Sequence, residues 1–177
     1  GGLVFERRIG LIFERCRHEA NMDTADPIEL PRRPGPAPEV VGPAPHAQRS
    51  QIAPVMVQEE LWSRMRALPY VYMAPTLVSV SHARALHLPH GIGSAATERF
   101  QGGREFAHLH PHHDGSLHLS LPAWAREAAV RSGWGVPHPV QDAFLVFGPR
   151  DRVELDVAWL LVRLSHAWAM GEIDETS

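Results

Sequence analysis

The chain has 177 residues and a formal net charge of -3, with 44% hydrophobic and 21% charged residues, values typical of a globular protein. All 17 basic residues are arginine, so Schiff-base chemistry, Ser-Lys catalysis and a Walker-type phosphate lysine are excluded. A single cysteine excludes an internal disulfide and every multi-cysteine metal site. The acidic balance argues against a nucleic-acid partner, and no apolar run reaches the length of a membrane span. We expect a cytoplasmic protein that acts on a small molecule.

The amino-acid composition of the N-terminal part of the chain changes twice, after residue 20 and after residue 50. Residues 1–20 mix apolar and charged side chains in a pattern that predicts an amphipathic helix. Residues 21–50 contain seven prolines, which exclude a helix or a central strand and predict an extended arm. Apolar Ile52, Val55 and Val57 follow directly, so we favour an arm that wraps the domain over a simple linker. Residues 51–177 then form the main domain.

Within this domain the elements follow from hydrophobic periodicity and from end signals. Helical spacing predicts a helix from Pro54 to Leu68, and alternation predicts one or two strands between residues 76 and 88. A glycine-rich loop follows at 91–103. The remaining predicted elements are strands at 104–110 and 116–121, a helix at 123–131, a strand at 143–147 and a last helix at 151–171.

The last helix has the clearest end signals. Asp151 is the predicted N-cap, Glu154 stands three residues later as in a capping box, and Gly171 is the predicted stop. Together the elements predict an α+β fold. Its mostly antiparallel sheet carries a His-rich hairpin and is packed by helices on its apolar face. The extended Pro-rich arm precedes it.

The predicted hairpin REFAHLHPHHDGSLHLSLP carries most of the chemistry. A tight turn at Asp114 would mix the polar and apolar faces, whereas a five-residue loop at 111–115 places His108 opposite His118. We choose the longer loop. On the resulting polar face His110 lies two residues from His108, and Glu105 points to the opposite face. The other members of the polar face are Phe106, Ser116 and Ser120.

Three uses of this imidazole group remain open at the level of sequence. The side chains of His108, His110 and His118 could bind zinc, copper or iron. They could transfer protons, because imidazole titrates near neutrality. They could also be ordinary hydrogen-bonded residues on a solvated face, which is about as frequent as the other two together.

Two further segments combine reactive side chains with rigid backbone. In Gly133–Pro139, Trp134 and His138 lie between glycines and prolines. Arg150 precedes the N-terminus of the last helix, where an anionic or enolate oxygen would be stabilised. The ordinary explanations are a core position for Trp134 and a salt bridge for Arg150, and we weigh them evenly with function.

The ordered motifs EFAHLHPHHDGSLHLSLP, GWGVPHP, GPRDRVEL and LSHAWAMG resemble the luciferase-like domain family, which includes the fungal luciferases. LPRRPGPAP and HAQRSQ extend the resemblance upstream and are typical of bacterial members. It covers roughly residues 29–171. Fungal luciferases also carry an N-terminal membrane helix, and we expect none in this chain.

The resemblance implies a cofactor-free oxidation in which a hydroxylated hispidin-type pyrone reacts with molecular oxygen as co-substrate, loses carbon dioxide and emits light. His108, His118, His110 and Arg150 are then the candidate catalytic residues, with His108 or His118 as the base and Arg150 holding an enolate oxygen. The candidate substrate contacts are Phe106, Ser116, Ser120, Trp134 and His138. No cofactor is expected.

Two alternatives stand beside this hypothesis. One is a metal-dependent hydrolase or dioxygenase that uses His108, His110 and His118 as ligands. The other is a non-enzymatic module that binds a hydrophobic small molecule. The oligomeric state does not follow from the sequence.

Overall fold

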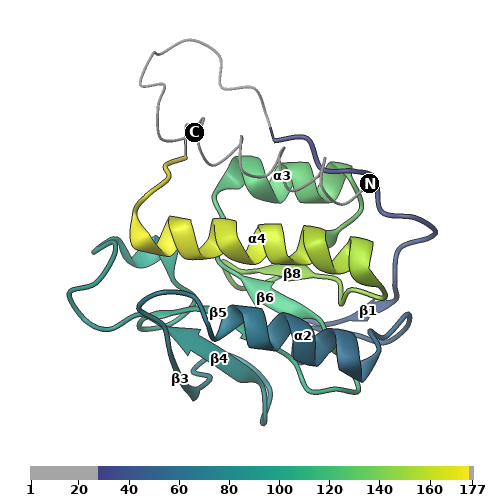
Figure 1. Cartoon of the computed structure of the whole chain (residues 1–177), viewed down its shortest axis with the longest axis horizontal. Coiled ribbons are helices and arrows are strands. Elements are labelled where there is room, and N and C mark those ends of the chain that lie inside the picture. The colour runs from purple at the N-terminus through teal and green to yellow at the C-terminus, as the bar shows by residue number, and fades with distance from the viewer. Residues whose placement is uncertain (1–27, 176–177) are drawn as a thin grey trace.

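The central element is a six-stranded sheet whose strands pair antiparallel in the order β3-β4-β5-β6-β8-β7 (Figure 1). The computed structural model describes residues 28–175, so the predicted helix at 1–20 and the start of the arm lie outside the described residues. The strands are β3 (Tyr72–Pro75), β4 (Arg84–His87), β5 (Glu105–Leu109), β6 (Leu117–Leu119), β7 (Gly135–Pro137) and β8 (Phe144–Val146).

Helices cover the apolar face of this sheet. The long helix α4 (Arg152–Met170) crosses β5 and β6, with α2 (Val55–Met65) and α3 (Ala123–Arg131) beside it (Figure 1). Leu109, Leu117 and Leu119 are fully buried in the shared core. The predicted α+β class, with a mostly antiparallel sheet packed by helices and a histidine cluster, is confirmed.

The ends of α4 agree with the predicted signals. The Asp151 carboxylate accepts the N–H of Glu154, and Gly171 has the left-handed conformation of a C-cap with φ of 76°. The Glu154 carboxylate in turn accepts the N–H of Arg150 at 2.9 Å, a variant of the capping box. Both ends of the helix are therefore specified locally.

The described part of the proline-rich segment, residues 28–50, lies against the domain. The carbonyl of Pro31 accepts the indole N–H of Trp134 at 2.6 Å, and the N–H of Arg33 donates to Ser132. Two short strands, β1 (Val40–Val41) and β2 (Ala47–Gln48), form a separate antiparallel ladder. This segment brings residues 46–48 to the sheet face opposite the helices.

Of the one or two strands predicted between residues 76 and 88, one is present as β4. Residues 76–80 form no strand, because Thr76 and Leu77 turn to donate hydrogen bonds to the carboxylate of Glu105. The rigid segment Gly133–Pro139 contains a strand that the sequence does not predict, β7. It is the edge strand next to β8, where Pro137 is tolerated because one side of the strand needs no ladder donor.

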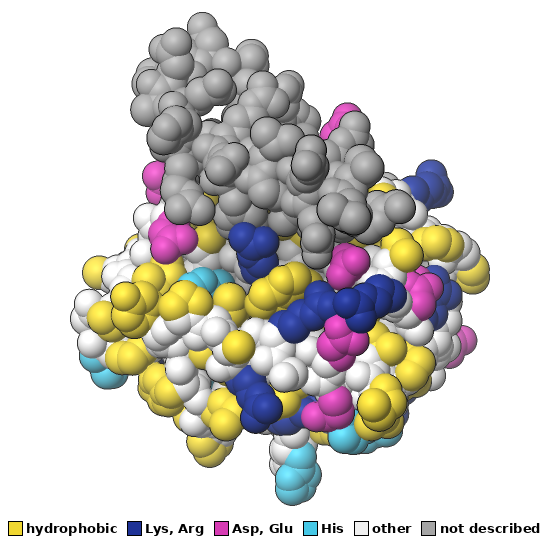
Figure 2. Space-filling view, viewed as in Figure 1, with side chains coloured by type: hydrophobic (Ala, Val, Ile, Leu, Met, Phe, Trp, Pro, Cys, Tyr) yellow, Lys and Arg dark blue, Asp and Glu magenta, His cyan; other side chains and the backbone are white. Residues whose placement is uncertain are grey.

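The outer surface over the helices mixes both signs of charge, and Figure 2 shows arginine and acidic side chains next to one another there. Arg64 pairs with Glu60 at 2.6 Å and with Asp156 at 3.3 Å, and Arg152 also reaches Glu60. Arg64 and Arg152 are thus partnered by carboxylates.

Candidate functional site

The histidine hairpin has the register that its polar pattern predicts. His108 pairs directly with His118, and the N–H of His110 donates to the Ser116 carbonyl at 2.9 Å. The connection is the five-residue loop 111–115. The central β5–β6 pair therefore presents its imidazoles on one face, away from α4.

A β-bulge at the start of β5 changes which side chains share that face. Between residues 86 and 87 the register with β4 shifts, so that residue 106 is an extra residue in β5. Phe106 consequently points into the helix-covered core, where its ring contacts His166 of α4 at 5.7 Å between centroids. Glu105 instead turns to the imidazole face and bonds His108. The predicted faces of Phe106 and Glu105 are thus wrong, because strict alternation assumes an unbroken strand.

His118 is the centre of the imidazole cluster. Its Nδ1 lies 3.0 Å from Nε2 of His108 and 3.1 Å from Nε2 of His110. Its Nε2 lies 3.0 Å from Nδ1 of His46, which the proline-rich segment contributes. The ring of His138 packs against His46 with centroids 4.6 Å apart. Five imidazoles from four parts of the chain therefore meet at one place.

Two buried carboxylates hold the outer nitrogens of the cluster. Glu105 Oε1 accepts from Nδ1 of His108 at 2.7 Å, and Asp114 Oδ2 accepts from Nδ1 of His110. The other hydrogen bonds to these carboxylates come from the Thr76 hydroxyl, the Leu77 N–H, the Ser116 hydroxyl and N–H, and the Gln48 N–H. Each carboxylate fixes the orientation of one ring.

Burial sets the protonation of these groups at neutral pH. Burial, followed by the neighbouring rings, lowers the pKa of His118 and lowers the pKa of His46 to about 4. Burial also outweighs the Glu105 hydrogen bond and lowers the pKa of His108. For Glu105 and Asp114 burial acts to raise the pKa, but hydrogen bonds from His108 and from His110 lower it overall. These rings are therefore neutral and the carboxylates ionised.

The hydrogen-bond partners assign the tautomers. Because an ionised carboxylate only accepts, Nδ1 of both His108 and His110 carries a proton, and in the neutral form of each ring Nε2 has a lone pair that faces the centre. Nε2 of His110 also lies 3.1 Å from the Ser79 hydroxyl. His138 is the opposite case. Its Nδ1 accepts the N–H groups of Val140 and Gln141 at 3.2 and 3.1 Å, so its proton is on Nε2.

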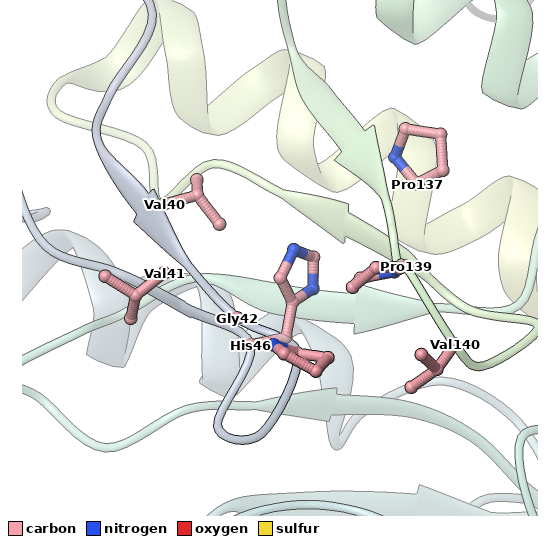
Figure 3. Close-up of a pocket in the computed structure, with 8 residues that line it drawn as sticks. Val40, Val41, Gly42, His46, Pro137, Pro139 and Val140 are labelled. Atoms are coloured by element: carbon pink, nitrogen blue, oxygen red, sulfur yellow. The ribbon is translucent and has the colours of Figure 1, made fainter.

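A pocket of about 370 Å³ lies on the outer side of the cluster, and His46 forms part of its lining. Figure 3 shows the His46 ring standing between the β1 segment on one side and Pro139 and Val140 on the other. The remaining lining residues are Val40, Val41, Gly42, Pro43 and Pro137. The pocket is therefore mostly apolar, with an imidazole as its titratable group.

Two sets of three imidazoles place one nitrogen each within 4.8 Å of one another. The first set, His108, His110 and His118, is fully buried and is the set that the sequence offers for a metal. The second set is His46, His118 and His138. His118 belongs to both.

Two more of the predicted substrate contacts lie at the hairpin. Ser116 is buried and donates to Asp114 Oδ1 at 2.6 Å, so it supports the carboxylate. The hydroxyl of Ser120 is buried and has no hydrogen-bond partner among the described residues. His138 joins the cluster, as its ring contacts show.

Trp134 and Arg150 have structural partners. Trp134 is 2% exposed in the hydrophobic core and donates its indole N–H to Pro31. Arg150 forms a salt bridge with Glu154 and also donates to Gln51 at 2.9 Å and to the carbonyl of Pro34. These contacts agree with the ordinary explanations, a core ring and an ion pair.

Sequence reasoning missed three members of the cluster. His46 lies 72 residues before its partner His118, and no local sequence pattern predicts that contact. Asp114 falls in the predicted loop at 111–115, where its position gives no sign of a contact with His110, and the predicted alternation puts Glu105 on the wrong face. A histidine within a proline-rich arm that is expected to wrap the domain was the one available signal for His46.

The fold and the site define a small α+β domain with a buried imidazole cluster beside an apolar pocket. Residues 103–165, which include His108, His110 and His118, match the family model of the luciferase domain. The chain is 32% identical over 162 residues to a luciferase of Armillaria gallica and 30% identical over 164 residues to one of Neonothopanus nambi. No solved structure matches the chain significantly.

Residues 103–165 thus belong to the luciferase domain family, and the chain as a whole is similar to the fungal luciferases. Each alignment covers 77% of this chain and 60% of the fungal relative, so the chain spans about three fifths of the length of these relatives. Within residues 28–175, none of the helices has the length and apolarity that a membrane crossing requires.

Proposed function

We propose that this protein is a luciferase-type oxygenase that oxidises a small, planar, enolisable molecule, such as a hydroxylated pyrone, with molecular oxygen. Family membership supports an oxygen-using enzyme. The observation that carries the proposal is His46, which lines the apolar pocket and bonds the buried cluster through His118 at 3.0 Å.

The pocket suits a flat and largely apolar molecule. Val40, Pro139 and Val140 offer apolar surface for a ring system, and desolvation of that surface favours binding. His46 is the polar group that would orient such a ring. Since Nδ1 of His46 faces His118, its Nε2 is the nitrogen left for the substrate.

The chemistry requires an ionised enol. The enol oxygen loses its proton to solvent water and the enolate is held by a hydrogen bond from His46 Nε2–H. The enolate then transfers one electron to molecular oxygen, and the resulting carbon radical and superoxide combine into a carbon-bound peroxide. Both oxygen atoms enter the adduct and the electrons balance. Breakdown of this peroxide releases carbon dioxide and leaves a carbonyl product.

His46 therefore takes the contact with substrate that the sequence assigned to His108 or His118. Neither ring is among the residues that line the pocket, and both are held between the carboxylates and His46. They support His46 instead of contacting the pyrone.

The test is oxygen uptake by the purified protein with hydroxylated pyrones, with light emission recorded in parallel. Replacing His46 with Phe removes the donor and keeps a ring, and should lower turnover by about 10²–10³-fold. His166→Phe is the matched control, because it makes the same change at a buried histidine on the helix side. Equal turnover in His46→Phe and the wild type would refute the assigned role, and no uptake by the wild type would refute the oxygenase.

A further inference from the structure

We propose that His108 Nε2, His110 Nε2 and His118 Nδ1 bind one divalent transition-metal ion per chain. This site goes beyond the oxygenase proposal, because ion binding is measured without substrate. Three separate properties of the cluster support it: the direction of the lone pairs, the charge around them and the tautomer of the competing set.

The lone pairs converge on one point. With the protons of His108 and His110 held on Nδ1 by Glu105 and Asp114, both Nε2 atoms face Nδ1 of His118 at 3.0 and 3.1 Å. A single proton on that Nδ1 cannot point at both acceptors at once, and the Ser79 hydroxyl, 3.1 Å from His110 Nε2, can serve only one of them. A cation, by contrast, can accept all three lone pairs. Zinc with Zn–N bonds of about 2.0–2.1 Å requires nitrogens about 3.3 Å apart in tetrahedral geometry. The two distances to His118 are within a few tenths of an ångström of that value, and the ligand atoms of the three rings all lie within 4.8 Å of one another.

The negative charge of the two buried carboxylates also favours a cation at this site. Glu105 is 0% and Asp114 3% exposed, and every hydrogen bond that the structure gives them comes from a neutral group or a histidine ring. Two buried carboxylates without an arginine partner in the described structure are costly. An ion of charge +2 behind the His108 and His110 rings would balance them, as in carboxylate–histidine–metal arrangements.

The second imidazole set, which contains His46, His118 and His138, does not offer three lone pairs to an ion. Nδ1 of His138 is occupied by the N–H groups of Val140 and Gln141, and its Nε2 carries the proton. Neither nitrogen of neutral His138 then offers a free lone pair, so the set with His46 and His118 lacks a third ligand. The structure therefore favours one ion and not two.

Ion binding would also fix the tautomer at the pocket. With Nδ1 of His118 on the ion, the proton of that ring is on Nε2 and is donated to Nδ1 of His46. The proton of His46 is then on Nε2, which makes it the donor that the oxygenase proposal requires. In this respect the inference deepens the proposed function.

The experiment is zinc titration of the whole chain after removal of metal with a chelator, followed by calorimetry and by thermal unfolding. We expect one Zn²⁺ per chain and a higher Tm with zinc. His108→Asn and His110→Asn should abolish both effects. Asp114→Asn and Glu105→Gln, which keep all three ligands, should weaken binding by about 10–100-fold.

Two control variants locate the ion. His138→Asn should leave zinc affinity unchanged, and so should His166→Asn on the helix side. Loss of binding in His138→Asn with retention in His108→Asn would place the ion in the other set and overturn the proposal. So would two ions per chain, or no binding by a wild-type protein whose circular dichroism shows it folded.

The outcomes separate this site from the oxygenase. Zinc binding by a protein that consumes no oxygen would leave the metal site standing and refute the proposed function. Oxygen uptake by a protein that binds no zinc, cobalt or ferrous ion would refute the metal site and support the proposed function.

Discussion

The two faces of the central sheet bury their residues by different means. On the helix side, Leu117 and Leu119 of β6 are fully buried with α4 packed across them, and their stabilisation is apolar. On the opposite side, His118 of the same strand is 4% exposed and is bonded at both ring nitrogens. One strand of three residues thus serves both a core and a site.

The difference teaches why the two faces tolerate change differently. Hydrophobic burial is non-directional, so a leucine needs only filled space around it. A buried imidazole needs a particular partner at each nitrogen, and removal of one partner leaves a costly unpaired group. The helix side therefore stabilises the fold, and the imidazole side depends on exact neighbours drawn from distant segments.

The largest expected effect comes from acid on the metal-free protein, because it acts on the imidazole side as a whole. His46 has a pKa of about 4 through burial, then His138 and His110, with Asp114 opposing, and burial also lowers the pKa of His118. The unfolded chain takes up these protons below about pH 6.5, before the folded chain does. The free energy of unfolding should fall between about pH 6.5 and 4, by up to about 1.4 kcal/mol per pH unit for each such ring.

Chemical denaturation with chelator at a series of pH values measures this dependence. His46→Asn removes one of these titrating rings. The slope of the free energy of unfolding against pH should therefore decrease by an amount that corresponds to at most one proton. A free energy of unfolding that is constant from pH 7 to 4.5 would contradict the difference between the faces.

A large-to-small change on the helix side should cost stability alone. Leu119 is fully buried, so Leu119→Ala should lower the free energy of unfolding by about 2–5 kcal/mol. Turnover per folded molecule and zinc affinity should stay as in the wild type, because the leucine points away from the imidazoles. Urea titration and zinc calorimetry at low temperature test the two expectations, and a tenfold loss of zinc affinity would show that the faces are coupled.

Most of the helix side could be predicted from the sequence, because its signals are local. The helix at Ala123–Arg131 has the predicted bounds, and Asp151 and Gly171 mark the ends of α4. Each depends on residues within one or two turns. No strand forms at residues 76–80 for the opposite reason, since the Thr76 hydroxyl and the Leu77 N–H donate to Glu105 from elsewhere in the chain.

The imidazole side could be predicted only in its hairpin. Polar alternation fixed the pairing of His108 with His118. It could not show the bulge at Phe106, which depends on the register with β4, nor the contact of His46 with His118 across 72 residues. Such contacts depend on how the folded backbone brings distant segments together. They produce no periodic pattern in the sequence.

A smaller loss of stability is expected from replacing Trp134. This variant distinguishes a role of the ring in the core from a role in covering the substrate. Trp134→Phe keeps an aromatic ring but leaves the Pro31 carbonyl without its donor, which should cost about 1–3 kcal/mol. Turnover should remain within a factor of two of the wild type. Denaturation and oxygen uptake on the same preparation measure both, and a loss of turnover without a loss of stability would restore the predicted contact with substrate.

The smallest effect is expected at Arg150, whose guanidinium bonds Glu154, Gln51 and Pro34 at the edge of the helix side. Its side chain is 30% exposed, and Glu154 keeps Arg33 at 3.5 Å when Arg150 is replaced. Arg150→Gln should therefore lower the free energy of unfolding by no more than about 1 kcal/mol. It should also leave oxygen uptake unchanged, since neither Arg150 nor any of these three partners lines the pocket. A hundredfold loss of uptake in a stable Arg150→Gln protein would mean that the enolate reaches this helix end, and that the site extends beyond the imidazole side.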